Sequence, residues 1–113
     1  MASDECWLVC GGHVLASAER ATGRGSRARG LLGRDGIDGA MVLAPCRSVH
    51  TLGMRFALDV AYLDEQGVVI KLARMNRNRI GLPVWKARSV IEAEAGAFER
   101  WSLQVGQQVE LRE

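Results

Sequence analysis

The sequence lacks any long apolar run, and it lacks the features of an export signal. No run in the 113-residue chain approaches the roughly 20 apolar residues that a membrane-spanning helix requires. The first residues, Met1–Cys6, are acidic and contain neither the basic segment nor the apolar core of a signal peptide. We therefore expect a cytoplasmic protein without a membrane span.

Lysine and aromatic residues are also scarce. Only Lys71 and Lys86 are lysine among the 15 basic residues, and the net charge is +2. That charge is too small to indicate nucleic-acid binding, and the six aromatic residues lie mostly in apolar runs, where they cannot stack on bases. We expect no nucleic-acid partner.

Cysteine is limited to Cys6, Cys10 and Cys46. An odd number without the spacing of a small disulfide framework is typical of a reducing compartment, where cysteine acts as a small apolar residue. We therefore expect three reduced thiols.

Phosphate-binding loops are absent as well. Residues 23–28 match the loose G-x-G-x-x-G/A pattern, but that pattern binds a dinucleotide only within a parallel strand–turn–helix unit, and the surrounding chain is typical of hairpins. Gly25 and Gly30 have P-loop spacing, but no Lys-Ser/Thr pair follows them. We expect no cofactor.

What the chain does contain is a series of short strand patterns separated by turn residues. With 113 residues, 48% of them hydrophobic and 25% charged, it is long enough for one domain with one core. Apolar runs on both sides of Gly11-Gly12, and again of Asp64–Gly67, predict two hairpins. Further strands are expected at 40–44, 49–59, 89–94 and 109–111. Short helices are expected at 26–32, with Ser26 as N-cap, and at 96–101. Trp85, after the loop 76–81, is expected to be buried. We predict a single domain over residues 1–113, mainly β, as a compact antiparallel β sandwich or partly closed barrel of jelly-roll type with one or two short helices.

The stretch Val49–Asp59 carries the densest polar chemistry of the chain. Its apolar residues fall at alternate positions, which is typical of an extended strand with one buried face. On such a strand Arg55 and Asp59 share a face, and Asp59 would hold the Arg55 guanidinium ready for a carboxylate. We predict a cleft for a small anionic ligand or a partner peptide. Its expected ligand-binding residues are His50, Thr51, Arg55, Asp59, Arg29 and Arg34.

Two other interpretations of this stretch stay open. Cys46, His50 and Asp59 are of the types that a nucleophile, its base and an orienting acid require. A Cys/His-dependent enzyme requires Cys46 to lie within hydrogen-bonding distance of a His50 ring nitrogen, beside a pocket. Alternatively, an ion pair between Arg55 and Asp59 would be purely architectural, because buried polar groups must be paired in any case.

A zinc site is a third possibility that the same residues raise. Cys46 and His50 have ligand-like spacing, and a third ligand would have to come from elsewhere in the chain. The candidates for it are Cys6, Cys10 and His13. Because zinc sites usually combine two closely spaced pairs and this sequence has one, we expect no metal.

Several segments, in this order along the chain, resemble one bacterial and archaeal family. They are Arg29–Arg34, Pro45–Cys46, His50–Asp59, Leu63–Asp64, Val90–Glu92, Ala95–Gly96 and Leu103–Gly106. Together they resemble the uncharacterised family called domain of unknown function 192, in its shorter form without an export signal. The resemblance implies a small, mainly β domain of sandwich or jelly-roll type, and it implies no reaction. Since relatives are sometimes encoded among genes for envelope or pilus assembly, it also raises the alternative of a structural or interaction protein.

Overall fold

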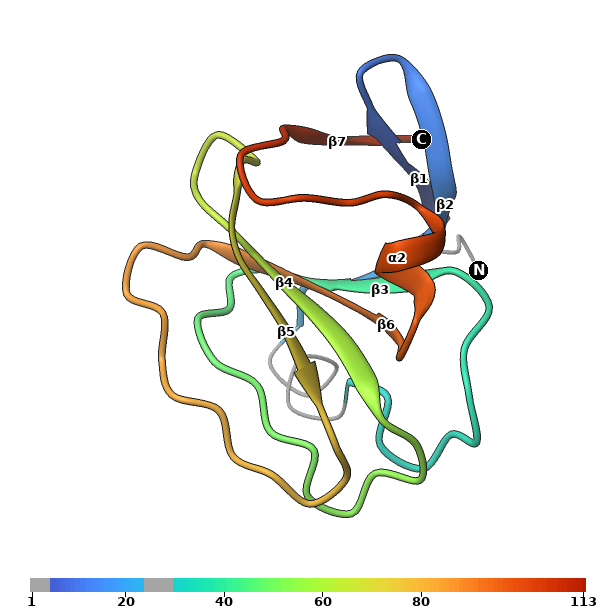
Figure 1. The fold of residues 1–113 in the computed structure, drawn as a ribbon, viewed down its shortest axis with the longest axis vertical. Coiled ribbons are helices and arrows are strands. Elements are labelled where there is room, and N and C mark those ends of the chain that lie inside the picture. Colours follow the sequence, from blue (N-terminus) through green and yellow to red (C-terminus); the bar gives the residue numbers. More distant parts are fainter. Residues whose placement is uncertain (1–4, 24–29) are drawn as a thin grey trace.

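In the computed structural model, which describes residues 5–23 and 30–113, seven strands form one curled sheet (Figure 1). The strands are β1 (Glu5–Cys10), β2 (His13–Ala21), β3 (Ala40–Leu43), β4 (Leu58–Leu63), β5 (Val69–Met75), β6 (Ser89–Glu94) and β7 (Val109–Arg112). Their order is β5-β4-β6-β3-β2-β1-β7, and β2–β3 is the parallel pair of this sheet. The prediction of a mainly β, partly closed barrel is confirmed, as a single sheet; the jelly-roll type stays a prediction.

Both predicted hairpins are present, and their turns explain them. Gly11 and Gly12 join β1 to β2 with φ of 57° and 81°, a conformation that glycine adopts without strain. Gly67, with φ of 78°, closes the turn between β4 and β5. A Cβ atom at Gly67 would lie 2.7 Å from the carbonyl oxygen of Val109, so a larger residue would displace β7.

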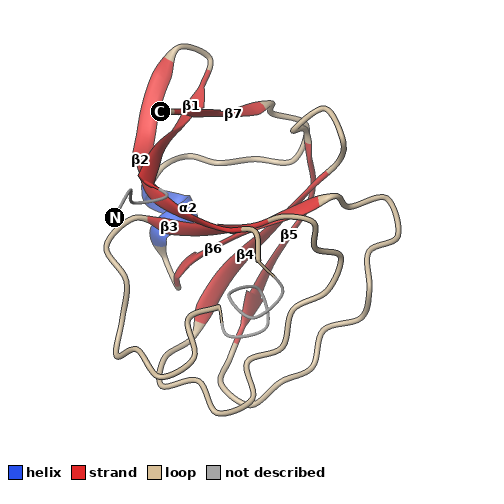
Figure 2. Cartoon of the chain, turned by 180° about the vertical axis from the view of Figure 1, so that it is seen from behind, coloured by secondary structure: helices blue, strands red, loops and turns tan. Residues whose placement is uncertain are grey.

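The sheet has a core on each face. One face, which we call the helix side, packs Ile91 and Ala93 against the short helix α2 (Ala97–Arg100). The other, which we call the loop side, is covered by long connections (Figure 2) and contains Val90 and Tyr62. β3, predicted as a buried central strand, is fourth of the seven described strands and buried along its whole length.

Two expected helices have different outcomes. The one at 96–101 is present as α2, over Ala97–Arg100. Of the one at 26–32, Ser26 lies outside the described residues, and 30–32 form a turn. In the described part of the chain, no helix has the length and apolar character needed to cross a membrane. The cytoplasmic location stays a prediction.

The predicted strand at 49–59 is wrong over most of its length, because β4 begins only at Leu58. A turn occupies the middle: the backbone N–H of Met54 donates to the carbonyl oxygen of Thr51 at 3.1 Å, and Gly53 has φ of 75°. The apolar alternation reflected a turn that buries Met54, and not an extended chain. The expected burial of Trp85 is also wrong, since it is 75% exposed.

Candidate functional site

Thr51, one of the predicted ligand-binding residues, is fully buried and bonds to backbone groups. Its Oγ1 donates to the carbonyl oxygen of Asn76 at 2.6 Å and accepts from the backbone N–H of Arg79 at 2.9 Å. The backbone N–H of Thr51 also donates to the carbonyl oxygen of Arg79, at 2.8 Å. Thr51 therefore fastens two loops together on the loop side of the sheet.

Cys46 and His50 also lie on the loop side, but their hydrogen bonds do not join them. Cys46 Sγ donates to the carbonyl oxygen of Ser48 at 3.2 Å, and His50 Nδ1 accepts from the backbone N–H of Leu52 at 3.3 Å. Asp59 points to the other face of the sheet, against α2. Within the described residues, the three members of the enzyme alternative thus form no connected nucleophile–base–acid chain.

The expected ion pair between Arg55 and Asp59 is wrong. Arg55 Nη1 donates to Asp35 Oδ1 at 2.9 Å, in a pair whose side chains are 59% and 88% exposed. Asp59 Oδ1 accepts instead from Arg74 Nε at 3.0 Å. The expected pairing fails because Arg55 lies in a bend before β4, where the spacing of a strand does not apply.

The other expected cations are Arg34 and Arg29. Arg34 donates from Nη1 and Nη2 to the two carboxylate oxygens of Glu19, at 2.8 and 3.1 Å. This charge-assisted bond lowers the pKa of Glu19 and raises the pKa of Arg34. Arg29 lies outside the described residues. Ligand binding by His50, Arg34 and Arg55 stays a prediction, and both of these arginines already have a carboxylate partner.

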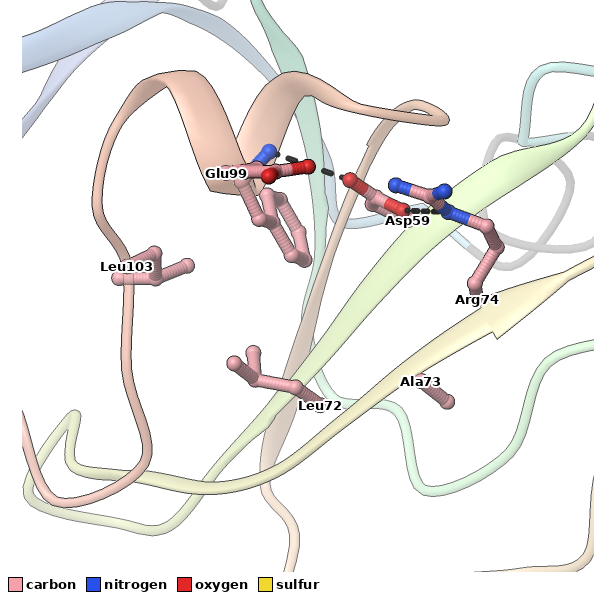
Figure 3. Close-up of a pocket in the computed structure, with 7 residues that line it drawn as sticks. Asp59, Leu72, Ala73, Arg74, Glu99 and Leu103 are labelled. Carbon is pink, nitrogen blue, oxygen red and sulfur yellow. Dashed lines mark hydrogen bonds and ion pairs between the residues drawn. The ribbon is translucent and has the colours of Figure 1, made fainter.

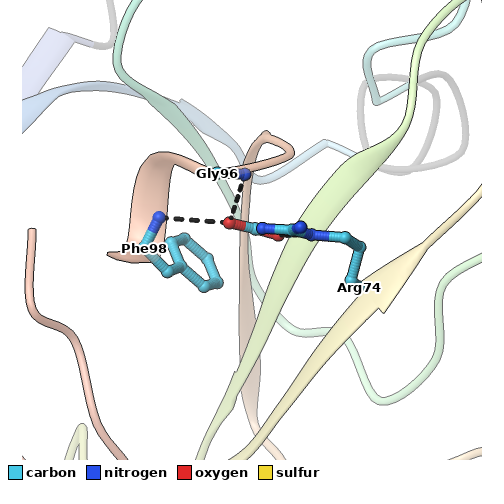
Figure 4. A network of polar contacts seen from close by, with 4 residues as sticks. Arg74, Gly96 and Phe98 are labelled. Carbon is cyan, nitrogen blue, oxygen red and sulfur yellow. Dashed lines mark hydrogen bonds and ion pairs between the residues drawn. The ribbon is translucent and has the colours of Figure 1, made fainter. Parts of the chain in front are cut away.

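Asp59 is the centre of a polar network on the helix side, whose other members, Arg74, Gly96 and Phe98, are labelled in Figure 4. It is 4% exposed, and its Oδ2 accepts from the backbone N–H of Gly96 at 2.9 Å and of Phe98 at 3.1 Å, while Oδ1 accepts from Arg74. Arg74 is Asp59's direct cross-strand neighbour in the β4–β5 pair, so the two side chains share a face. The three donors compensate the buried negative charge and tie α2 to the sheet.

An open depression with a volume of about 390 Å³ lies beside this network (Figure 3). Its lining residues are Asp59, Leu72, Ala73, Arg74, Phe98, Glu99 and Leu103. The Arg74 side chain is 54% exposed and is held through Nε; no described residue accepts a hydrogen bond from Nη1 or Nη2. The hydrogen bond to Asp59 raises the pKa of Arg74, and the negative charges of Asp59 and Glu99 add to that effect.

The sequence analysis found Asp59 but missed Arg74. The hairpin predicted at the Asp64–Gly67 turn contained the information needed to find Arg74. Counting residues away from the turn along both strands pairs each residue with its cross-strand partner. An irregularity between Tyr62 and Leu63 shifts the register by one residue, from Leu63 opposite Val69 to Asp59 opposite Arg74. Counting without that irregularity would have paired Asp59 with Ala73, so that Arg74 would have pointed to the other face.

The zinc alternative has no ligand set in the described part of the chain, where no three His, Cys, Asp or Glu side chains gather as a metal site would require. Cys6, Cys10 and His13 lie on the β1–β2 hairpin, and Cys46 and His50 lie in the loops that follow β3. The three cysteines, all of them in the described ranges, form no disulfide.

Comparison with known proteins identifies a family and a curated relative. The sequence profile of the DUF192 family, described as "Uncharacterized ACR", matches residues 9–111. A curated relative from Pyrococcus furiosus, UPF0127 protein PF1050, is 35% identical over 63 residues, which cover 56% of this chain and 54% of the relative. The chain therefore matches about half the length of that relative.

Two solved structures are similar in fold. A protein of unknown function from Novosphingobium aromaticivorans has a TM-score of 0.76 and 17% identity, with 94% of this chain and 83% of that one covered. A suggested transcription regulator from Sinorhizobium meliloti has a TM-score of 0.79 and 18% identity, with 97% and 94% covered. At these identities the similarity establishes the fold alone.

Proposed function

The chain belongs to the DUF192 family, and from its own geometry we propose that the domain is a binding module for a ligand with a carboxylate beside an apolar group. The observation that carries this proposal is the state of Arg74. Its Nε is held by the buried Asp59, its two terminal nitrogens have no partner among the described residues, and it borders an open depression of about 390 Å³.

Arg74 is held in place at the pocket before any ligand binds. A guanidinium held at Nε presents Nη1 and Nη2 as a planar pair of donors, which matches the two oxygens of a carboxylate. Because Asp59 already restrains the side chain, less conformational entropy is lost when the ligand binds. The predicted role of Asp59, to hold an arginine for an anion, is kept in this proposal, with Arg74 in place of Arg55.

Leu72, Phe98 and Leu103 favour an apolar group next to the carboxylate. Glu99 further restricts which ligands fit, because it lines the same depression without forming an ion pair with Arg74. Its negative charge would repel a simple anion but would accept a hydrogen bond from a ligand N–H. These features together fit the C-terminal residue of a peptide, which carries a carboxylate, an apolar side chain and an amide N–H.

The test is thermal stabilisation by N-acetyl-leucine, with N-acetyl-leucinamide as the ligand control. At a concentration tenfold above the dissociation constant, the acid should raise Tm by about 6 °C, which corresponds to about 1.4 kcal/mol in a domain of this size. The amide, which lacks the carboxylate, should have no effect. Arg74→Ala should abolish the shift.

Arg55→Ala is the matched control variant, since Arg55 is also an exposed arginine paired with an aspartate, but lies in the loops. It should keep the full response to the acid. If Arg55→Ala lost the Tm shift and Arg74→Ala kept it, the ligand site would lie on the loop side and not beside Arg74. No stabilisation of the parent protein by N-acetyl-leucine or N-acetyl-phenylalanine would refute the proposal.

A further inference from the structure

Two long loops, residues 44–57 and 76–88, run side by side on the loop side of the sheet (Figures 1 and 2). We call the surface that they form the basic loop face. A bridge pairs His50 with Ile80 in antiparallel fashion. It is framed by two hydrogen bonds, from the Thr51 N–H to the Arg79 carbonyl at 2.8 Å and from the Gly81 N–H to the Val49 carbonyl at 2.9 Å. The two loops therefore form one surface.

The basic loop face is strongly positive by composition. Its 27 residues contain six of the chain's 15 basic residues and none of its 13 acidic ones. Arg55 is paired with Asp35. The other five form no ion pair with any described residue: they are Arg47, Arg77, Arg79, Lys86 and Arg88.

Several of these cations are held by the backbone and not by carboxylates. Arg47 Nε and Arg88 Nη1 donate to the carbonyl oxygen of Ala87, at 3.2 and 3.3 Å. Arg79 Nη1 lies 3.4 Å from the carbonyl oxygens of two preceding residues. A neutral carbonyl positions a guanidinium but leaves its charge uncompensated. Asp64 and Glu65 border a small depression together with Lys86 and Arg88, but they form no ion pair with either of them.

Large apolar side chains project from the same loops. Ile80, Leu82 and Trp85 are 74%, 80% and 75% exposed, and Leu52 is 44% exposed. The pairing explains why they point outward. Val49 and Thr51 are buried, so the chain between them directs His50 outward, and its partner Ile80 shares that direction.

The next two residues continue the alternation. A Cβ atom at Gly81 would point inward, 2.8 Å from the carbonyl oxygen of Val49, so Leu82 points outward again. Exposed apolar residues gathered on one surface are unfavourable in water and typical of an interaction surface. Here they are interleaved with five cations that form no ion pair within residues 5–23 and 30–113.

We propose that the basic loop face docks on the surface of an anionic lipid bilayer. Cations attract acidic headgroups, while Trp, Leu and Ile enter the boundary between headgroups and acyl chains. Nucleic acid fits less well, because it offers little to bind aliphatic tips such as Ile80 and Leu82, and stacking would rest on Trp85 alone. The face lies across the sheet from the Arg74 pocket, so docking leaves that pocket open.

Flotation with vesicles tests the proposal. The parent protein should float with phosphatidylcholine vesicles that contain 30% phosphatidylserine, and should remain in solution with phosphatidylcholine alone. Raising the salt concentration should release it, because the attraction is electrostatic. Tryptophan emission should be quenched by brominated lipid, and Trp85→Ser should remove most of that quenching.

Two variants separate charge from apolar insertion. Arg77→Glu/Arg79→Glu should weaken partitioning by about tenfold or more, since each basic residue near an anionic surface contributes appreciably. Ile80→Ser/Leu82→Ser should weaken it comparably while keeping the charge. Lys71→Glu/Arg112→Glu, which changes net charge by the same amount elsewhere, and Trp7→Ser/Val14→Ser, which removes exposed apolar residues from the β1–β2 hairpin, should float as the parent does.

The outcome that overturns the proposal is equally specific. Equal flotation of the parent and of Ile80→Ser/Leu82→Ser, with each variant folded by circular dichroism, would show that no apolar group enters the bilayer. Binding to a labelled DNA duplex more tightly than to the acidic vesicles would assign the face to nucleic acid. Absence of flotation at low salt would exclude membrane docking altogether.

Discussion

Asp59 and Glu92 are neighbouring carboxyl groups on opposite sides of the same sheet. They lie on the paired strands β4 and β6, and each is 4% exposed. Asp59 faces the helix side, where its oxygens accept from Arg74 and from two backbone N–H groups. Glu92 faces the loop side opposite the apolar Val60 and Met41, and its Oε1 has no hydrogen-bond partner in the described part of the chain.

Equal burial therefore has different consequences for the two groups. Donors aimed at Asp59 replace the water that its carboxylate loses, and the charge becomes part of the structure. Without such donors, burial raises the pKa of Glu92 to about 7. On the helix side the buried acid anchors Arg74 and α2, while the loop side contains an acid whose charged form is unfavourable. This contrast can be tested on each side separately.

The largest effect is expected for Asp59→Ala. Removing the carboxylate leaves the N–H groups of Gly96 and Phe98 without an acceptor and separates α2 from β4. We expect the free energy of unfolding to fall by about 3–5 kcal/mol, measured by urea denaturation. Asp59→Asn keeps an oxygen for the two N–H groups and should lose about half as much. A loss below about 1 kcal/mol in Asp59→Ala would show that the network does not hold α2.

On the loop side, removing the charge in Glu92→Gln should stabilise the protein, whereas removing Asp59 destabilises it. The pKa of Glu92 rises from 4.5 to about 7 on folding, so the folded state retains a proton that the unfolded state releases between these values. The contribution of the protonated Glu92 to the free energy of unfolding is fully present below about pH 4.5 and is lost as pH rises through 7. Glutamine avoids this loss, so above pH 7 the variant should be more stable than the parent by on the order of 3 kcal/mol.

Urea denaturation from pH 5 to pH 8 measures the difference between Glu92→Gln and the parent protein. Glu94→Gln is the control, because Glu94 lies two residues further along β6 and is exposed. Its stability should follow that of the parent across the whole range. Parallel curves for Glu92→Gln and the parent would mean that Glu92 finds a partner in the folded protein and that the two faces do not differ as stated.

The smallest effect is expected at the exposed pair of Arg55 and Asp35. Its bond, at 2.9 Å, is as short as the 3.0 Å bond between Arg74 and Asp59, but both of its side chains are mostly exposed to solvent. A double-mutant cycle with Arg55→Ala and Asp35→Ala should give a coupling below about 0.5 kcal/mol. A coupling above about 1 kcal/mol would mean that this contact stabilises the loops. It would also mean that the donor–acceptor distance of an ion pair determines its strength more than its burial does.

Short-range patterns predicted much of the fold. Gly11-Gly12 and Asp64–Gly67 marked their hairpins because these turns need residues that adopt them without strain. The apolar run at Ala40 marked a buried strand because nothing in it could face water. The segment 49–59 misled, since its turn at Gly53 repeats the apolar spacing of a strand.

The candidate site was predictable only in part. Asp59 was identified by its chemistry, as a carboxylate among apolar neighbours. Its partner was not, because the irregularity after Tyr62 shifts the register by one residue and thereby selects Arg74. Trp85 was expected inside because indole is large and apolar, but it belongs to a loop that packs its neighbour Val84 inward.

By itself, then, the sequence determined the mainly β class, the hairpins and the family, because these depend on residue types close together in the chain. Only the tertiary structure decided which arginine meets Asp59 and which loops gather exposed Ile80 and Leu82 beside cations. It also decided which side of the sheet leaves Glu92 Oε1 without a donor among the described residues. These outcomes depend on strand register and on what covers each face. A shift of one residue reverses them while the local pattern stays the same.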